Sequence, residues 1–284
     1  MKIEEIQPRL FQIFSRLKET NNLSHAYLFI GNFGNFDLSI WLAQAIFCQE
    51  EKSPCGKCRI CQLVEINEFT ELKIIEPEGQ MIKVAQIRAL LGDFSSTGFE
   101  SDKKVLIIRE ADKLGESASN ALLKTIEEPT SEYYIFLLTE KENLILPTIR
   151  SRVQSVVFPK NKDYLSELLK KEKLQPSEIE LLLELVTSVE QALELSQSSW
   201  YLSVSHQLED FVEKCQQSTD EAFLSIVNFI TLFKEKKEEE LIFSILLLLF
   251  NRKGMHKFTE KSFKAEKMWH SNVSFQSCLE SICL

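Results

Sequence analysis

The sequence predicts an α/β fold whose first half holds a mostly parallel sheet and whose second half is helical. From residue 24 to about residue 158, short segments rich in β-branched and aromatic residues alternate with helical patterns. This alternation is typical of a parallel sheet covered by helices on both faces. After Pro159 the strand pattern disappears. A chain of 284 residues, 44% hydrophobic and 26% charged, is ordinary for a globular protein of two or three domains.

Five segments have the composition of buried strands, and polar or turn residues bound each of them. They are AYLFIG (26–31), ELKIIEP (71–77), KKVLIIRE (103–110), YYIFLLTE (133–140) and VQSVVF (153–158). Helical patterns lie between them, such as KVAQIRALLGDF (83–94) and SASNALLKTIEE (117–128), the second of which is stopped by Pro129.

The remaining residues predict two helical units. Residues 161–203 contain short amphipathic helices, with Ser177 as a helix cap after Pro176, and residues 204–284 contain longer and more apolar helices. We therefore divide the chain into domains 1–160, 161–203 and 204–284. The longest apolar stretch, Leu241 to Phe250 with Ser244 inside it, is far below the roughly 20 residues that a membrane span needs.

The charge pattern limits the partners that the chain can have. A net charge of −9 argues against broad neutralisation of nucleic-acid phosphates, although residues 251–270 hold six lysines and arginines against two glutamates. That basic run is explained either by a solvated helix face or by a contact with a partner or a phosphate. The N-terminus MKIEEIQPRLFQIF carries acids where a secretory signal is basic, so we expect a cytoplasmic protein.

Four cysteines predict a metal site. Cys48, Cys55, Cys58 and Cys61 follow the spacing C-x6-C-x2-C-x2-C. Four thiolates can close a tetrahedral zinc site that leaves no position for a catalytic water, so the zinc would be structural. The alternative is that Cys48 is a small core residue at a helix end and that the other three are surface thiols.

The segment YLFIGNFGNFDLSIWLAQAIF (27–47) has the outline of a phosphate-binding loop but lacks its chemistry. Gly31 and Gly34 follow an apolar strand, yet Phe36, Asp37 and Leu38 stand where a P-loop has glycine, lysine and serine or threonine. A second nucleotide motif fails in the same way, because Arg109, followed by Glu110, stands where an aspartate would help to hold Mg²⁺. A guanidinium cannot coordinate a cation. We therefore expect no ATP in this site.

Three motifs make the resemblance to a known family specific. They are SHAYLFIG (24–31), SASNALLKTIEEP (117–129) and LPTIRSRVQ (146–154). With them, residues 7–160 resemble the clamp-loader subunits of bacterial replicative DNA polymerase, which belong to the AAA+ class. The family's Ser-Arg-Cys tripeptide is Ser151, Arg152 and Val153 here, so the cysteine does not match. The four-cysteine insert resembles the family's zinc module. The likeness is moderate to about residue 200 and thin beyond it.

The resemblance implies a fold and a set of partners. It implies an AAA+-like domain with a zinc module, a helical lid domain and a C-terminal helical collar. A zinc module, a Ser-Arg motif and a degenerate loop together resemble the delta prime subfamily, a non-motor part of DNA polymerase III. The implied partners are the motor (gamma/tau) and delta subunits and, through the complex, the sliding clamp and primed DNA, with no membrane. Lid positions that often carry glycine and a nucleotide-sensing arginine hold Thr187 and Gln191 here.

The resemblance also implies roles for particular residues. Arg152, beside Ser151, would act in trans as an arginine finger on ATP bound by a neighbouring motor subunit. Because LPTIRSR follows the fourth strand, we expect Arg152 at the ligand edge of the sheet. The chain itself would have no intrinsic ATPase activity. Two alternatives remain: a weakly active subunit whose backbone amides after Gly34 still hold a nucleotide, and a zinc-containing nucleic-acid-binding module.

Overall fold

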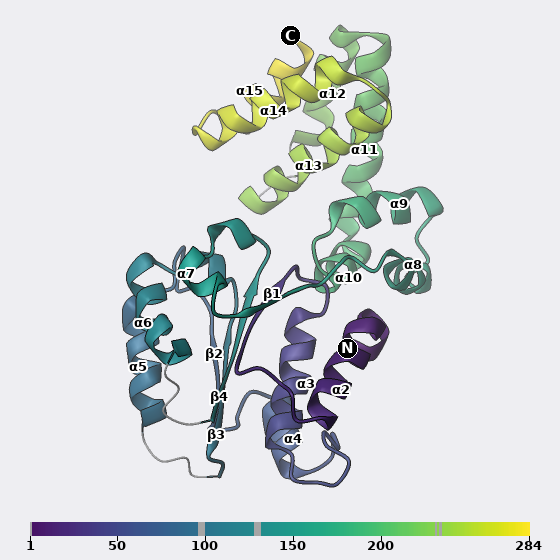
Figure 1. Cartoon of the computed structure of the whole chain (residues 1–284). Helices are drawn as coiled ribbons and strands as arrows, with labels where there is room; N and C mark the ends of the chain where they lie inside the picture. The colour runs from purple at the N-terminus through teal and green to yellow at the C-terminus, as the bar shows by residue number, and fades with distance from the viewer. Residues whose placement is uncertain (1, 96–99, 128–131, 231, 233–234) are drawn as a thin grey trace. The chain divides into compact units, whose positions relative to one another are not determined.

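The computed structural model describes residues 2–95, 100–127, 132–230, 232 and 235–284. The chain forms two compact units, Met1–Tyr164 and Leu165–Leu284, and each is described by itself. The first unit is built around a five-stranded sheet (Figure 1). Its strands are β1 (Ala26–Ile30), β2 (Leu72–Ile75), β3 (Lys103–Ile108), β4 (Glu132–Thr139) and β5 (Gln154–Val157). These positions confirm the five strands predicted from the sequence.

Every strand pair in this sheet is parallel, and the order is β2-β3-β4-β1-β5. The three central strands are β3, β4 and β1, whose side chains are nearly all buried. Continuous apolar strands of this kind are stable only when both faces of the sheet are covered. The predicted α/β fold with a parallel sheet is confirmed.

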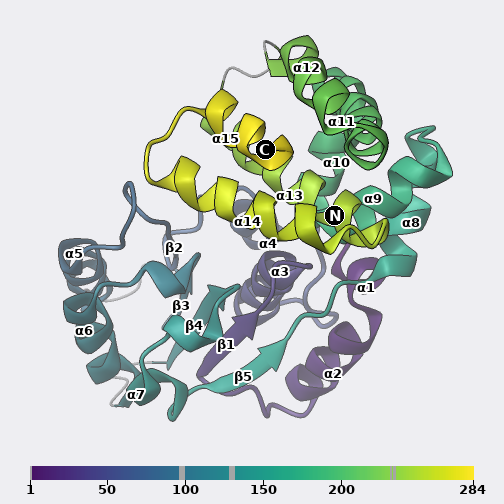
Figure 2. The same ribbon diagram turned by 90° about the horizontal axis from the view of Figure 1, so that it is seen from above.

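Helices cover both faces of the sheet (Figure 2). Helices α5 (Val84–Ser95), α6 (Glu116–Glu127) and α7 (Pro147–Arg150) pack on one face around a core that includes Leu106 and Leu122. Helices α2 (Pro8–Glu19), α3 (Asn35–Phe47) and α4 (Arg59–Glu65) pack on the other face around Phe29 and Phe136. A short helix, α1 (Ile3–Ile6), lies beside the start of α3. The predicted stop of α6 at Pro129 lies outside the described residues.

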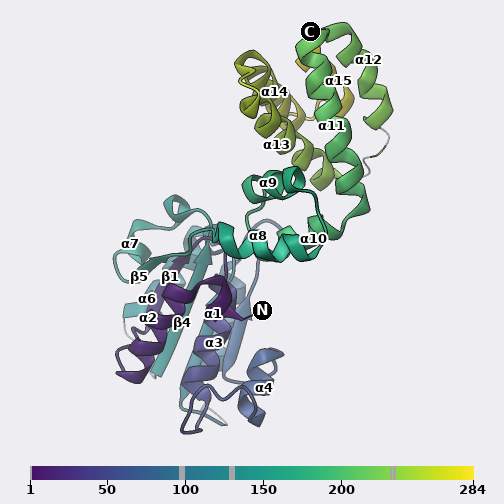
Figure 3. The same ribbon diagram turned by 90° about the vertical axis from the view of Figure 1, so that its right-hand side faces the viewer.

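The second unit is helical, as predicted (Figure 3). Helix α8 (Lys162–Lys171) leads into it, followed by α9 (Pro176–Leu185), α10 (Val189–Gln197), α11 (Ser199–Gln217), α12 (Thr219–Ile230), α13 (Lys236–Arg252), α14 (His256–His270) and α15 (Phe275–Cys283). Helix α11 packs against α12 and α13, and α14 packs against α13 and α15. No helix of the described residues is long and apolar enough to cross a membrane.

The second unit differs from the sequence prediction at the cap of α9, and α11 crosses a predicted domain border. Helix α9 is capped by Gln175 and not by Ser177, because Pro176 occupies the first helical position and the cap residue precedes it. The backbone N–H of Gln175 donates to the Glu178 carboxylate at 2.6 Å. Helix α11 runs without a break across the predicted border at residues 203 and 204. The boundaries of the three-domain division stay a prediction.

Candidate functional site

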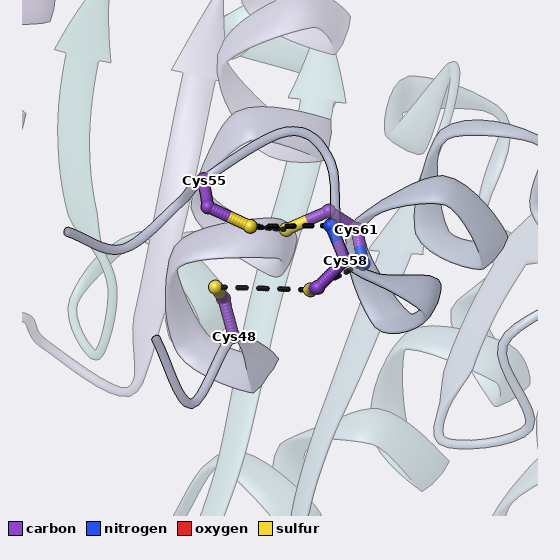
Figure 4. Close-up of side chains that lie close together, drawn as sticks. All are labelled: Cys48, Cys55, Cys58 and Cys61. Atoms are coloured by element: carbon purple, nitrogen blue, oxygen red, sulfur yellow. Dashed lines mark hydrogen bonds between the residues drawn. The ribbon is translucent and has the colours of Figure 1, made fainter. Parts of the chain in front are cut away.

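The structure brings the four predicted cysteines together (Figure 4). Cys48 ends α3, Cys58 is the N-cap of α4, Cys61 lies in the first turn of α4, and Cys55 comes from the loop between the two helices. Their Sγ atoms all lie within 4.8 Å of one another. Two helix ends and one loop therefore converge on a single point.

The separations between the sulfur atoms fit a tetrahedral zinc ion. The Cys48–Cys58 and Cys55–Cys61 Sγ–Sγ distances are both 4.0 Å. A regular tetrahedron with a zinc–sulfur distance of about 2.3 Å has edges of about 3.8 Å. All four side chains are free thiols. The site can thus hold one zinc ion with sulfur ligands only, and such a closed site serves structure.

The loop between Cys55 and Cys58 prepares a thiolate ligand. Gly56 has a φ of 67°, in the left-handed region that favours glycine. The turn directs the N–H groups of Lys57 and Cys58 at the Sγ of Cys55, at 3.4 and 3.2 Å. These two hydrogen bonds lower the pKa of Cys55 to about 7. Burial instead raises the pKa of Cys61, so a metal ion bound there must displace the thiol proton.

A buried glutamine braces the cysteine site, and the sequence analysis did not identify it. Gln44 of α3 donates from Nε2 to the backbone oxygen of Cys61 at 3.0 Å and to the Glu65 carboxylate at 2.8 Å. The Ser53 hydroxyl donates to the backbone oxygen of Ala45 at 2.9 Å. These contacts fix α4 and the loop against α3. An isolated polar residue within an apolar helix was the available signal.

Other parts of the chain occupy the space beside the two glycines of the loop after β1. Gly31 has a φ of 98°, and a Cβ atom there would lie 2.6 Å from the backbone oxygen of Phe158. Gly34, the N-cap of α3, has a φ of 85°, and its Cβ would lie 2.9 Å from Cδ1 of Ile3 and 3.1 Å from Cγ2 of Ile6. Helix α1 therefore packs its apolar side chains on the glycine that begins α3.

The residues that replace the P-loop chemistry also have intramolecular roles. Leu38 is fully buried where a metal-binding hydroxyl would stand. Asp37 lies in the first turn of α3, where a negative charge is stabilised by the positive end of the helix dipole. The Arg109 guanidinium lies over the Phe36 ring, 4.8 Å from its centroid, and Nη1 pairs with Glu76 at 2.5 Å.

Neighbouring strand ends contribute further polar contacts. Glu110 has a φ of 49° and pairs with Lys113 at 2.6 Å. Asn32, in the loop, donates to Glu140 at the end of β4. The carboxylate of Glu110, the one acid retained from the second motif, is therefore engaged within the chain.

A cavity of 740 Å³ lies between α1, α3 and the cysteine loop. Its charged lining consists of Glu4, Asp37, Glu65 and Lys2, so acids outnumber bases. A phosphate group entering this cavity would meet a net negative field.

The two lid positions singled out in the sequence, Thr187 and Gln191, contact each other in the second unit. The Gln191 side chain accepts a hydrogen bond from the backbone N–H of Thr187 at 2.7 Å.

Arg152 lies just after α7, at the amino edge of the sheet. Gln154 of β5 pairs with Tyr27 near the start of β1, whereas Gly31 follows the end of β1. The expectation that Arg152 lies at the ligand edge is therefore wrong. A parallel β5 must begin at the amino edge, so the chain returns there through α7 first.

Contacts within the chain hold the Arg152 guanidinium. Its Nε pairs with the Glu127 carboxylate at 2.5 Å, and the side chain is still 41% exposed. Its Nη1 donates to the backbone oxygen of Thr148 and to the hydroxyl of Ser151, both at 3.1 Å. The nearby Arg150 pairs with Glu142 at 4.0 Å. The structure therefore brings the predicted pair, Ser151 and Arg152, into contact.

The strand order β2-β3-β4-β1-β5, the glycine loop before α3 and the helical second unit give the chain an AAA+-like fold. A gamma-subunit-related protein of DNA polymerase III from Thermotoga maritima has a similar fold, with a TM-score of 0.56 and 19% identity over 95% of this chain and 96% of that one.

A family model described as "DNA polymerase III, delta subunit" matches residues 6–162. The delta prime subunit of DNA polymerase III from Bacillus subtilis is 31% identical over 100% of this chain and 97% of its own length. The Pseudomonas aeruginosa delta prime subunit is 32% identical over 55% of this chain and 49% of its own. The chain belongs to the delta prime family of DNA polymerase III clamp-loader subunits.

Proposed function

We propose that this chain is a non-motor clamp-loader subunit that helps to load the sliding clamp on primed DNA and donates Arg152 to ATP bound by a neighbouring motor subunit. One observation carries the proposal: Arg152 and the loop of Gly31 lie at opposite edges of the sheet. Strand β1 has five residues, and at about 3.3 Å per residue it separates these edges by roughly 15 Å. Arg152 therefore cannot serve its own loop and suits a site on another subunit.

The same proposal covers the chain's own nucleotide site. Ile3 and Ile6 pack on Gly34, Asp37 carries the wrong charge, and Arg109 lies over Phe36. The packing on Gly34 and the charge of Asp37 oppose a bound triphosphate, and the Arg109 guanidinium cannot hold Mg²⁺, so we infer that the chain has no ATPase activity of its own. It would act in the cytoplasm within a complex of motor and delta subunits, with residues 204–284 joining the collar.

Zinc has a structural part in this proposal. The ion would be held by Cys48, Cys55, Cys58 and Cys61. Zinc with four sulfur ligands ties α3 to α4 and offers no open position for chemistry. Its chemistry does not enter the ATPase step.

The test is ATP hydrolysis by a reconstituted loader with sliding clamp and primed DNA. We expect Arg152→Ala to depress the steady-state rate, because a finger contributes about 10³–10⁵ in rate at the site it completes. The loss in the whole complex should be partial, since other interfaces keep their own arginines. Arg152→Lys should rescue little, because a point charge does not reproduce the planar fork of donors.

Arg150→Ala is the matched control, because Arg150 is a neighbouring arginine with similar exposure, 38% against 41%. It should leave the rate unchanged. Equal rates for wild type and Arg152→Ala, with assembly confirmed by gel filtration, would leave Arg152 a surface residue and overturn the proposal.

A further inference from the structure

The Glu127 carboxylate is the acidic partner of Arg152, and the helix that carries it packs into the core of the first unit. Glu127 ends α6, and the preceding turn contains Leu122 and Ile126, which are 0% and 2% exposed. The backbone oxygen of Ile126 lies 3.1 Å from Nε2 of His25, which immediately precedes β1. The backbone that carries Glu127 is therefore anchored to the core of the first unit.

The position of Glu127 in α6 does not favour a negatively charged side chain there. A carboxylate in the last turn of a helix lies near the negative end of the helix dipole, which disfavours it. The contact that balances it is the one with Arg152 at 2.5 Å. Exposed ion pairs contribute little to folding stability, and both partners here are exposed, 41% for Arg152 and 46% for Glu127. A role in orienting the arginine explains the pair better than a role in folding.

We propose that Glu127 is a positioning residue that holds Arg152 ready for the phosphate of the neighbouring subunit; this inference rests on the proposed function. Arginine has a long side chain that loses much rotamer freedom when it binds. Glu127 fixes the guanidinium at Nε, while Thr148 and Ser151 fix it at Nη1. A guanidinium carries five donors on three nitrogens, so it can serve a carboxylate on one edge and a phosphate on another.

The orientation of Arg152 is therefore set before the subunits meet. A pre-oriented group lowers the barrier without strengthening the binding of the substrate, provided that its geometry matches the reacting complex. Loss of Glu127 should thus lower kcat and leave the KM for ATP unchanged. Glu127→Gln keeps an oxygen acceptor at the same place and should restore part of the rate.

The experiment is steady-state ATP hydrolysis by the reconstituted loader with clamp and primed DNA. We expect Glu127→Ala to reproduce most of the kcat loss caused by Arg152→Ala, and the double variant to fall no further than Arg152→Ala, as residues acting as one unit do. Glu142→Ala is the matched control, because it removes the carboxylate paired with Arg150 nearby. It should behave as wild type.

The outcomes separate this inference from the proposed function. If Arg152→Ala has no effect, the proposed function fails. If Arg152→Ala lowers kcat while Glu127→Ala matches wild type, raises the rate, or adds a further loss in the double variant, the positioning role is overturned and the finger stands. Equal thermal midpoints of Glu127→Ala and Glu142→Ala show that both variants fold.

Discussion

Cys58 has two roles in the structure, and a pair of substitutions separates them. It is one of four converging thiols, and its Sγ accepts a hydrogen bond from the backbone N–H of Cys61 at 3.4 Å as the N-cap of α4. Serine keeps a side chain that can cap the helix, whereas alanine removes the cap as well. Loss of a side-chain cap costs about 1 kcal/mol. Cys58→Ser therefore isolates the loss of the metal ligand.

The expected magnitude follows from the number of ligands. Structural zinc in small domains binds with about 10–16 kcal/mol, so one ligand in four corresponds to about 2.5–4 kcal/mol. The four ligands lie at the end of α3, in α4 and in the loop between them, so the cost should fall first on residues 48–66. Backbone hydrogen exchange in that segment should accelerate about 60- to 700-fold in Cys58→Ser, since each 1.4 kcal/mol is a factor of ten.

The assay is hydrogen exchange followed by mass spectrometry, together with elemental analysis of protein purified without chelators. Wild type should contain one zinc per chain, and Cys58→Ala should exchange faster still than Cys58→Ser. Cys215→Ser, a change to a cysteine of the second unit that is not part of the metal site, controls for thiol loss elsewhere. Wild-type protein without zinc, or unchanged protection of residues 48–66 in Cys58→Ser, would refute the reasoning.

Three other predictions concern the loop and the second unit. Restoring lysine and threonine by Asp37→Lys with Leu38→Thr should not restore ATP binding in equilibrium titrations, because α1 still covers the start of α3; micromolar affinity would contradict this. Gly31→Ala should destabilise the chain more than Gly79→Ala in urea unfolding, since both have positive φ but only Gly31 lies against backbone; equal losses would contradict it. The Tyr201 hydroxyl is buried without a hydrogen-bond partner among the described residues, so Tyr201→Phe should stabilise by about 1 kcal/mol. Burial raises the pKa of Tyr201 above 10, so the part of the wild-type unfolding free energy that depends on a neutral Tyr201 is present below pH 10 and is lost as the pH rises further. Tyr201→Phe should therefore lose less unfolding free energy than wild type at alkaline pH, and identical alkaline unfolding curves would refute this.

Local patterns predicted most of the fold. The strands β3 and β4 are recognisable because each contains four consecutive apolar residues, Val105–Ile108 and Ile135–Leu138, as a strand covered on both faces requires. The cysteine site could also be predicted from the sequence, because the C-x2-C-x2-C spacing alone limits where three of its four ligands can lie. The cap of α9 was misplaced by two residues, because Pro176 and Ser177 are both common at helix starts and only the backbone shows which residue precedes the first turn.

Contacts between distant segments could not be predicted. The pair of Glu127 and Arg152 joins residues 25 positions apart, and no periodicity relates them. Arg152 was expected at the ligand edge of the sheet because its segment follows β4. Its actual location depends on the edge at which β5 begins. Sequence separation does not tell at which edge of a sheet a loop residue lies. Topology does, because every parallel strand starts at the same edge.

The loop after β1 shows why a glycine pattern can persist without a phosphate. Gly31 is required because the backbone oxygen of Phe158 lies where a Cβ would stand, and Gly34 because Ile3 packs there. Both glycines also adopt positive φ angles that other residues rarely take. The packing of this chain alone therefore demands the glycines, and Asp37 supplies the negative charge that the start of α3 favours. A glycine-rich turn between a strand and a helix thus indicates a backbone geometry. The residues at the positive, N-terminal end of the helix decide whether a phosphate can bind.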